Sequence, residues 1–316
     1  MIRPLLRLLC GLLIAQSAHA APFAWVTNQG ADSVTVIDTA TRKAIATVPV
    51  GHRPAGVVAA HDGSRIYVTN PESRDLTIID GPTHTPVATV PLGEGPLAIA
   101  IGPDDRFVFV ADWYEHQVYE LDTATMRIVR RIPAGKAPSG LAVTPDGTRL
   151  VVANRDDNDV SIIEIRTATA LATIPVGTAP FGVRLSHDAA HLYVANVRSS
   201  DVSIIDMHTL KVTATIKVRD FPYAIAEDPA RGRIFVTNQH DDTVSVIDLG
   251  TEKEITAIDV GGYPEGIALL PGGNEIYVAN WFDGNVSIID PDALRVIGEV
   301  ETGEGSRAYG DFIAPR

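Results

Sequence analysis

The sequence contains an internal repeat that returns every 42 residues, and this repeat limits the folds that the chain can adopt. The motif WVTN at 25–28 returns as YVTN at 67–70, and five further copies follow at the same step. The seven copies begin at Trp25, Tyr67, Phe109, Val151, Tyr193, Phe235 and Tyr277. A unit of this size cannot bury its own apolar residues, so tandem units must pack against one another. The sequence therefore predicts a repeat architecture.

Each repeat contains four short runs of β-branched and aromatic residues with turn residues between them. In one repeat these runs cover 56–60, 65–69, 76–79 and 87–92. No window shows a helical period, and the abundance of Val, Ile, Thr, Gly and Pro disfavours a helical solenoid. Four strands in a unit of this length are typical of a propeller blade. We therefore expect an all-β, seven-bladed β-propeller with four antiparallel strands per blade over residues 21–316.

The register of the repeat also predicts how the ring closes. After the first twenty residues the chain starts with a second strand, at 23–27, and it ends with a first strand, at 308–314. The N- and C-terminal strands should therefore share one blade. Such closure pairs edge groups that would otherwise remain open, and it fixes both ends of the chain.

The repeated motifs resemble those of a known family. The block YVTN at 67–70, followed by LTIID at 76–80 and VATVPLG at 87–93, is similar to the YVTN family of β-propeller repeats, and in particular to its compact exported YncE-like members. The resemblance covers almost all of the chain after the first twenty residues. It implies the propeller fold but no single activity, because propellers host many unrelated functions. Similar seven-bladed scaffolds occur in lactonases, methylamine dehydrogenase and nitrous oxide reductase.

The first twenty residues have the pattern of a secretory signal peptide. Arg3 and Arg7 are basic, 8–15 is apolar, and Ala18-His19-Ala20 is a small-x-small cleavage site. We therefore expect residues 1–20 to be removed near Ala20 and the protein to be periplasmic or secreted. The apolar run is shorter than the roughly 20 residues that span a bilayer, so we expect no membrane-spanning segment. Leu9 precedes Cys10 where a lipid anchor requires a small residue, so lipidation is not expected.

The charge of the chain disfavours polyanionic partners. The net charge is −13, and removal of Arg3 and Arg7 makes it −15. No run of Lys and Arg offsets this charge, whereas nucleic-acid binding depends on phosphate neutralisation by cations. Cys10 is the only cysteine, so the exported chain has no disulfide, no CxxCH haem motif and no cysteine nucleophile. We expect a monomer without a cofactor.

Residues that recur in every blade are expected to be structural. The Asn that ends most second strands and the Asp that ends most third strands can cap turns through their own backbone. Function should instead lie where the copies differ. The loops between second and third strands share a face of the ring with the connections from a fourth strand to the next first strand. We call this the variable face.

Aromatic and arginine side chains gather in the variable-face loops. Exposed aromatics with arginines are typical of recognition surfaces, although loop aromatics also pack against neighbouring blades. The candidate ligand-binding residues are Trp113, Tyr114, Arg155, Phe181, Arg198, Tyr223, Tyr263, Trp281, Phe282 and Arg307. We therefore expect a binding scaffold that recognises a protein or a small-molecule ligand of the cell envelope.

Two other classes of function remain open. Glu265 and Arg307 follow equivalent loop positions of adjacent repeats, and with His240 they are candidates for an acid/base group in lactone hydrolysis. A role as an accessory propeller in a redox pathway is another form of the enzyme alternative. His52, His116 and His240 are candidate metal ligands for a metal carrier, although no HxH or HxxxH spacing links them. We assign neither a catalytic nor a metal site.

Overall fold

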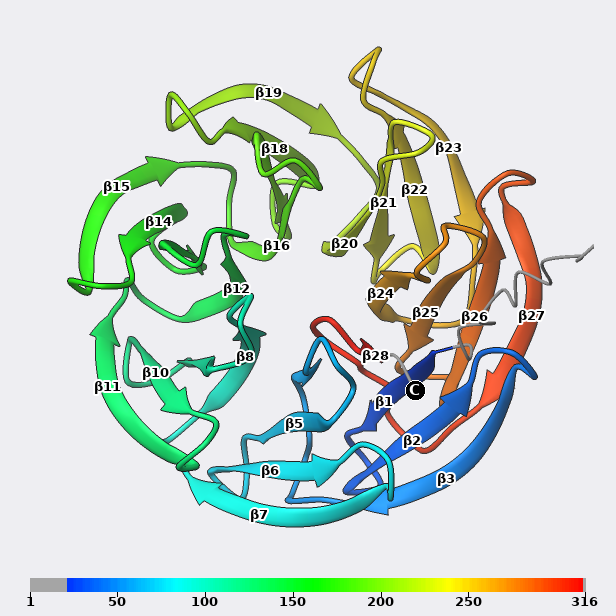
Figure 1. The fold of residues 1–316 in the computed structure, drawn as a ribbon. Coiled ribbons are helices and arrows are strands. Elements are labelled where there is room, and N and C mark those ends of the chain that lie inside the picture. The colour runs from blue at the N-terminus through cyan, green and yellow to red at the C-terminus, as the bar shows by residue number, and fades with distance from the viewer. Residues whose placement is uncertain (1–21, 315–316) are drawn as a thin grey trace, which may run out of the picture.

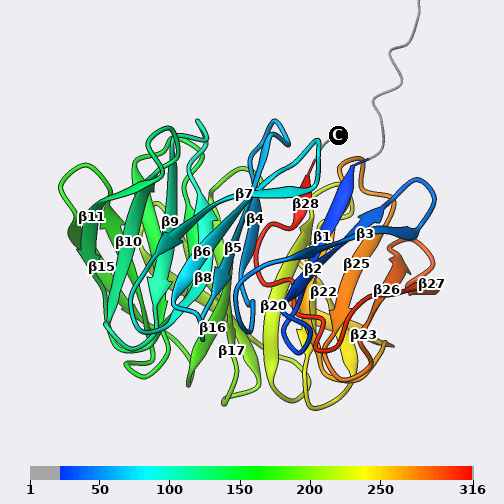
Figure 2. The same cartoon turned by 90° about the horizontal axis from the view of Figure 1, so that it is seen from below.

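The computed structural model describes residues 22–314, which form 28 strands in seven four-stranded antiparallel sheets. The sheets are arranged as blades around a central axis, and the chain visits them in order around the ring (Figure 1). Figure 2 shows the ring from its edge, with loops on both faces. The predicted seven-bladed propeller with four strands per blade is confirmed. Within 22–314 no helix is long and apolar enough to cross a membrane.

The first strand of each blade lies nearest the axis, and the fourth lies on the circumference (Figure 1). The first strands are β4 Val57–Ala59, β8 Pro96–Ile101, β12 Pro138–Val143, β16 Pro180–Leu185, β20 Pro222–Asp228, β24 Pro264–Leu269 and β28 Ile313–Ala314. The second strands are β1 Phe23–Asn28, β5 Arg65–Asn70, β9 Phe107–Asp112, β13 Arg149–Asn154, β17 His191–Asn196, β21 Arg233–Asn238 and β25 Ile276–Asn280.

The two outer strands of each blade follow the same step along the chain. The third strands are β2 Ser33–Asp38, β6 Asp75–Asp80, β10 Gln117–Asp122, β14 Asp159–Glu164, β18 Asp201–Asp206, β22 Thr243–Asp248 and β26 Asn285–Asp290. The fourth strands are β3 Lys43–Pro49, β7 Thr85–Pro91, β11 Arg127–Pro133, β15 Thr169–Pro175, β19 Lys211–Lys217, β23 Lys253–Asp259 and β27 Arg295–Glu301.

The ring closes in the blade with strand order β28-β1-β2-β3, which joins the two ends of the chain as predicted. The closing strand is shorter than expected, because regular pairing with β1 is confined to Ile313–Ala314. The residues that precede β28 form backbone hydrogen bonds with both β1 and β4 instead. Arg307 N donates to Thr27 O at 2.8 Å, and Val57 N donates to Tyr309 O at 2.9 Å. Gly310, at φ 130°, supplies a conformation that other residues rarely adopt.

The second strands are buried on both faces because each blade packs between two others. All seven residues that open the repeat motif are at most 3% exposed. They are Trp25, Tyr67, Phe109, Val151, Tyr193, Phe235 and Tyr277. Burial of such a side chain contributes roughly 1.5–3 kcal/mol relative to exposure. The motif therefore supplies the apolar contacts between blades, and this explains why it recurs.

Every outer strand of the seven sheets carries one extra residue at the same position of the repeat. In β11 the register passes from Glu120↔Arg130 to Leu121↔Ile128, so that Val129 has no partner. The bulge residues with exposed apolar side chains are Ile45, Val87, Val129, Leu171 and Ile255. A bulge twists and interrupts an edge strand, which hinders pairing with another chain.

The asparagines that end the second strands act differently from the prediction. Their side chains bond to third-strand side chains rather than to their own backbone. Asn70 Nδ2 donates to Asp75 Oδ1 at 2.7 Å and to Thr77 Oγ1 at 2.9 Å. Equivalent pairs of bonds occur at Asn28, Asn154, Asn196, Asn238 and Asn280. These buried amides fix the end of the second strand to the third strand of the same blade.

Candidate functional site

The two loop classes of the variable face lie together, as the repeat predicts. Gln29 N donates to Gly305 O at 2.8 Å, and Trp113 N donates to Gly95 O at 2.9 Å. Each bond joins a loop after a second strand to a connection between blades. The candidate residues of this face fall into three groups, namely a pocket between two blades, a buried network at the axis and a row of aromatic rings.

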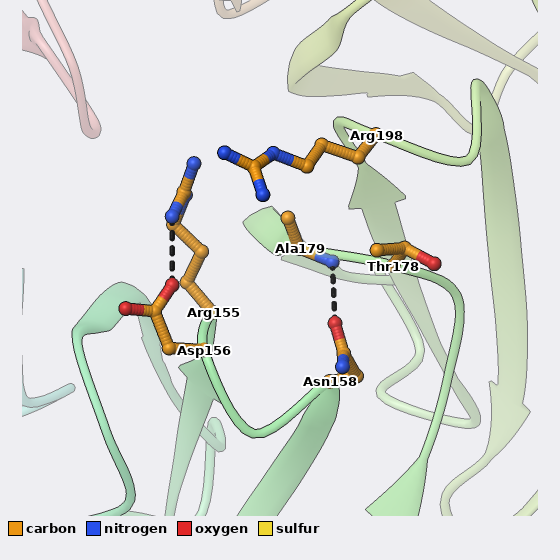
Figure 3. A pocket seen from close by; sticks show the side chains of 6 residues that line it. All are labelled: Arg155, Asp156, Asn158, Thr178, Ala179 and Arg198. Atoms are coloured by element: carbon orange, nitrogen blue, oxygen red, sulfur yellow. Dashed lines mark hydrogen bonds and ion pairs between the residues drawn. The ribbon is translucent and has the colours of Figure 1, made fainter.

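The pocket has a volume of about 410 Å³. It lies between the β13–β14 loop, the β15–β16 connection and the β17–β18 loop (Figure 3). Its lining residues are Arg155, Asp156, Asn158, Thr178, Ala179 and Arg198. Arg155 pairs with Asp156 at 2.7 Å, and its guanidinium lies 5.5 Å from the centre of the Trp113 ring. Three predicted contact residues, Trp113, Arg155 and Arg198, are thus brought to one region.

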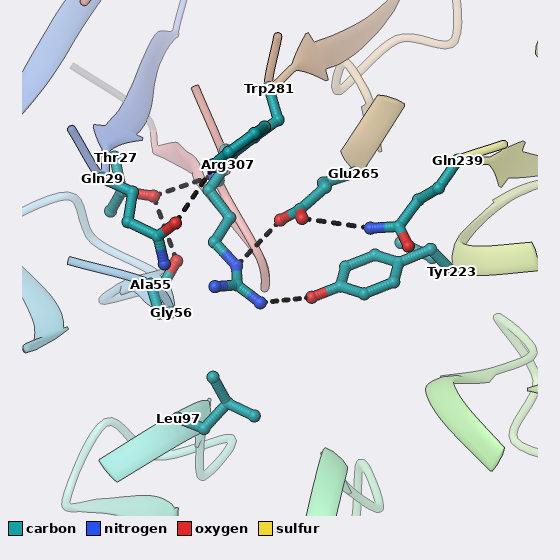
Figure 4. A network of polar contacts seen from close by, with 12 residues as sticks. Thr27, Gln29, Ala55, Gly56, Leu97, Tyr223, Gln239, Glu265, Trp281 and Arg307 are labelled. Carbon is teal, nitrogen blue, oxygen red and sulfur yellow. Dashed lines mark hydrogen bonds and ion pairs between the residues drawn. The ribbon is translucent and has the colours of Figure 1, made fainter. Parts of the chain in front are cut away.

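The buried network lies at the axis, where the residues that follow the loop prolines converge (Figure 4). Arg307 Nε is 2.8 Å from Glu265 Oε2, and the Arg307 guanidinium also donates to the Tyr223 hydroxyl at 2.6 Å. Gln239 Nε2 donates to Glu265 Oε1 at 3.0 Å. The Arg307 Nε–H is not aimed at Glu265 Oε2, so this short contact is an ion pair without a well-formed hydrogen bond.

Backbone contacts hold the charged residues in place. Thr237 Oγ1, in β21, donates to the Glu265 carbonyl at 2.8 Å. The Ala308 amide donates to Thr27 Oγ1 at 2.8 Å, which fixes the residue after Arg307. The inner strands also approach closely, since a Cβ on Gly266 would lie 2.0 Å from Ala308 O. The repeated scaffold thus positions side chains that are themselves not repeated.

Burial dominates the electrostatics of the axis. Loss of solvent raises the pKa of Glu265 to about 7, against the attraction of Arg307, which lowers it. Burial likewise raises the pKa of the Tyr223 hydroxyl well above its usual value. Burial opposes the charge on Arg307, but Glu265 and Tyr223 hold the pKa of the guanidinium above its usual value. The pair carries no net charge when both groups are ionised, and burial and Arg307 shift the pKa of Glu265 in opposite directions.

Three aromatic rings block the axis beside this network. Tyr309 reaches across the ring and its hydroxyl donates to Phe181 O at 3.2 Å. Phe181 stacks on Tyr223 with ring centres 4.3 Å apart, and Tyr309 meets both rings edge-on. All three side chains are buried. Phe181 and Tyr223, which we predicted as ligand contacts, therefore lie inside the ring rather than on its surface.

A row of aromatic rings crosses four neighbouring loops of the variable face, from the β19–β20 connection to the β25–β26 loop. Phe221 stacks on His240 at 3.7 Å, and Tyr263 links His240 to Trp281 and Phe282. The Trp281 indole N–H donates to the Gln29 side chain at 3.0 Å. Phe282 ends the row and is 67% exposed. We call these five residues the aromatic row. The other predicted aromatic, Tyr114, is exposed but lies in the β9–β10 loop, outside the row.

The structure does not bring the three candidate metal ligands together. His52 pairs with Asp32 at 2.8 Å, and His116 Nδ1 accepts from the Ala137 amide at 3.3 Å. His240 is held by Phe221 and lies 3.5 Å from Asp220. Within residues 22–314 no group of three His, Cys, Asp or Glu side chains is placed to hold a metal ion. The histidines are separated because each belongs to a different blade.

The candidate catalytic residues are only partly assembled. Glu265 and Arg307 form the buried ion pair, but the His240 ring belongs to the aromatic row and is paired with Asp220. Gln239 and Tyr309 also contribute to the axis, although neither is among the candidate site residues chosen from the sequence. A usable signal existed for Gln239, because it follows a strand-end Asn at a position that varies between repeats.

Comparison with known families agrees with this architecture. The family described as YNCE-like beta-propeller matches residues 100–221. This part of the propeller is therefore similar to the YncE-like β-propellers. A second family, described as the cytochrome D1 heme domain, matches residues 20–146 of the propeller. Each match covers part of the ring, as expected for a repeat whose units resemble one another.

Solved structures share the fold of this propeller at low sequence identity. A protein of unknown function from Desulfotomaculum acetoxidans is 16% identical with a TM-score of 0.79, covering 91% of this chain and 99% of its own. Kuenenia stuttgartiensis hydrazine synthase is 21% identical with a TM-score of 0.76, covering 90% and 99%. Dihydro-heme d1 dehydrogenase NirN in complex with DHE is 16% identical with a TM-score of 0.71, covering 90% and 74%. A search of curated proteins gives no match.

Proposed function

We propose that this protein is an exported binding propeller that recognises a protein or a small-molecule ligand through its variable face. One observation carries the proposal: side chains that differ between repeats gather on this face, where they form an aromatic row that ends in the exposed ring of Phe282. An aromatic side chain left 67% exposed beside other rings is a typical anchor for a partner.

The aromatic row is preorganised for binding. His240 is stacked on Phe221, and Trp281 is held by its hydrogen bond to Gln29. Side chains that are already fixed lose little conformational entropy when a ligand arrives, so a larger part of the contact energy appears as affinity. A rigid ring of blades also holds the loops without any disulfide.

Export belongs to the same proposal. The predicted signal peptide, residues 1–20, lies outside the described residues, and the described chain begins at Pro22. We propose a periplasmic or secreted monomer without a bound cofactor. Intact mass and N-terminal sequencing of the natively produced protein should show a chain that begins at Ala21. A retained Met1 would contradict export by this route.

The binding proposal is tested by purification from the native cell envelope followed by native mass spectrometry. We expect a retained ligand or partner that is lost on Phe282→Ala. The matched control is Val129→Ala, which truncates another exposed apolar side chain, on the circumference of the ring. A wild-type protein that retains nothing, or a ligand retained equally by both variants, would contradict the proposal.

The enzyme alternative meets an obstacle at the axis. An acid/base group for lactone hydrolysis must reach its substrate, but Glu265 is 5% exposed and both of its oxygens face Arg307 or Gln239. The trio also lacks His240, which is engaged elsewhere. Lactone turnover that disappears in Glu265→Gln would nevertheless favour this class over binding.

The match to the cytochrome D1 heme domain raises the alternative of a redox accessory. The axis does not fit a haem, because Phe181, Tyr223 and Tyr309 fill it and Tyr309 is bonded across it. The variable-face histidines are also engaged with residues of their own surroundings. We therefore derive no redox step. Absorption spectra and metal analysis of the native protein would reveal a haem or a carried metal, and His240→Ala would locate the metal.

A further inference from the structure

Arg198 is an exception among the cations of the variable face. The other arginines and lysines on these loops each form an ion pair with a carboxylate. These pairs are Arg53–Glu72, Arg74–Glu94, Lys136–Asp157, Arg155–Asp156, Arg219–Glu254 and Arg307–Glu265. Between residues 22 and 314 no carboxylate forms an ion pair with Arg198, although the chain carries a net charge of −13. An unpaired cation in so acidic a protein is available for an external anion.

The surroundings of Arg198 reinforce this inference. The guanidinium groups of Arg155 and Arg198 point toward one another across the pocket (Figure 3). Two cations that face each other repel unless an anion lies between them. The pocket supplies one carboxylate, Asp156, which pairs with Arg155. One carboxylate against two guanidinium groups leaves a local excess of positive charge.

Arg155 is held in position rather than mobile. Its side chain is 21% exposed, pairs with Asp156 and lies over the Trp113 ring. The Arg198 amide donates to Thr178 O at 3.0 Å, which fixes the loop that bears it. The exposed Thr178 lines the same pocket and carries a hydroxyl. The pocket therefore presents two guanidinium groups on loops that are already bonded to each other.

We propose that this pocket binds a single oxyanion group, a carboxylate or a phosphate, of a small ligand between Arg155 and Arg198. The inference rests on the proposed binding function and names the chemistry of one anchor. Guanidinium groups match such anions because their planar fork donates two parallel hydrogen bonds. A volume of about 410 Å³ exceeds what one oxyanion fills, so the rest of the ligand shares the pocket.

The test uses the full exported chain with two probes, succinate and inorganic phosphate, at low ionic strength. Trp113 fluorescence reports binding, because Arg155 lies over its ring. Isothermal titration calorimetry gives the affinity. We expect millimolar or tighter binding of one probe, weakened at least tenfold by Arg198→Gln and less by Arg198→Lys, which keeps the charge but not the fork. The control Arg74→Gln removes a paired cation of the same face and should not change the affinity.

The outcomes separate this site from the general proposal. Tighter binding of succinate assigns a carboxylate ligand, and tighter binding of phosphate assigns a phosphorylated one. Absence of binding by the wild type, or binding that Arg198→Gln does not weaken, overturns the anion site. A native ligand that is lost on Phe282→Ala but kept by Arg198→Gln would also overturn it, while the binding function of the face would stand.

Discussion

Two sets of buried polar groups lie at the same end of the blades, and their chemistry is opposite. The strand-end asparagines are neutral, recur in six blades and bond to third-strand partners of their own blade. The Glu265–Arg307 pair is ionic, occurs once and joins two blades at the axis. A neutral amide loses little when it leaves water for two good hydrogen bonds, whereas an ion pair loses several kcal/mol of hydration per ion.

The difference indicates that the two sets serve different purposes. A repeated neutral hydrogen bond stabilises each blade alike and adds no buried charge. A buried ion pair is weak evidence for stability, because apolar residues of similar volume often stabilise a protein as well or better. Its presence at one site at the axis is therefore better explained by a role in positioning. Arg307 bonds to the hydroxyl of Tyr223 and so orients this ring against Phe181.

Loss of one partner at the axis should have the largest effect. Arg307→Ala leaves Glu265 buried without a counter-charge, and we expect the free energy of unfolding to fall by about 3–5 kcal/mol at pH 8. Urea denaturation measures this loss. The double variant Arg307→Met with Glu265→Leu should recover most of it, because no buried charge remains. A double variant as unstable as the single one would mean that the ion pair itself stabilises the ring.

The pH dependence of stability should show the next largest effect. The folded pKa of Glu265 is about 7, above its usual value of 4.5, so the folded protein holds a proton that the unfolded chain releases. The contribution of this group is complete below about pH 4.5 and is lost as the pH rises through 7, for a total of about 3 kcal/mol.

The difference in unfolding free energy between wild type and Glu265→Gln isolates this contribution. We expect the wild type to lose stability relative to the variant between pH 5 and pH 8. A difference that does not change with pH would show that Glu265 is ionised throughout and that Arg307 outweighs burial. In that case the Glu265–Arg307 pair would keep both charges between pH 5 and pH 8, as an ion pair on the protein surface does.

Loss of one strand-end asparagine should lower the free energy of unfolding by less than loss of one partner of the Glu265–Arg307 pair. Asn280 Nδ2 donates to Asn285 Oδ1 at 2.7 Å and to Ser287 Oγ at 2.9 Å. Asn280→Ala leaves both acceptors buried without this donor, and we expect a loss of about 1–3 kcal/mol that is independent of pH between 5 and 8. Ser287→Ala added to Asn280→Ala should lower the free energy of unfolding by less than Ser287→Ala does in the wild type. The reason is that it removes one of the two acceptors that Asn280→Ala leaves without a donor. A loss as large as that of Arg307→Ala would erase the contrast between the two sets.

The aromatic row should show the smallest effect on stability. Phe282→Ala removes a largely exposed ring, and we expect the free energy of unfolding to change by no more than about 0.5 kcal/mol. Thermal denaturation beside Val129→Ala, which is similarly exposed, checks this. A destabilisation above 2 kcal/mol would show that Phe282 packs as part of the core, and the row would lose its assignment as a recognition surface.

The fold could be predicted almost entirely from the sequence because its cause is local and repeated. The same four-strand pattern returns in each unit, so errors in one copy are corrected by the other six. The closing strand was predicted least well. Residues 308–311 occupy the position of a first strand in the repeat, but they bond to β1 and β4 together rather than along β1 alone. Their pairing depends on both neighbours, which no single repeat encodes.

The candidate site could be predicted in part. Strand alternation and the repeat were enough to predict which loops share a face and which positions vary. Which of those residues meet depends on how their side chains pack in the folded ring. In the folded ring Arg307 pairs with Glu265 rather than with His240, Phe181 and Tyr223 lie inside the ring, and no carboxylate within residues 22–314 forms an ion pair with Arg198. The physical reason is that side chains from equivalent loop positions compete for the same space at the axis. Size, charge and reach decide that competition, and the repeat specifies none of them.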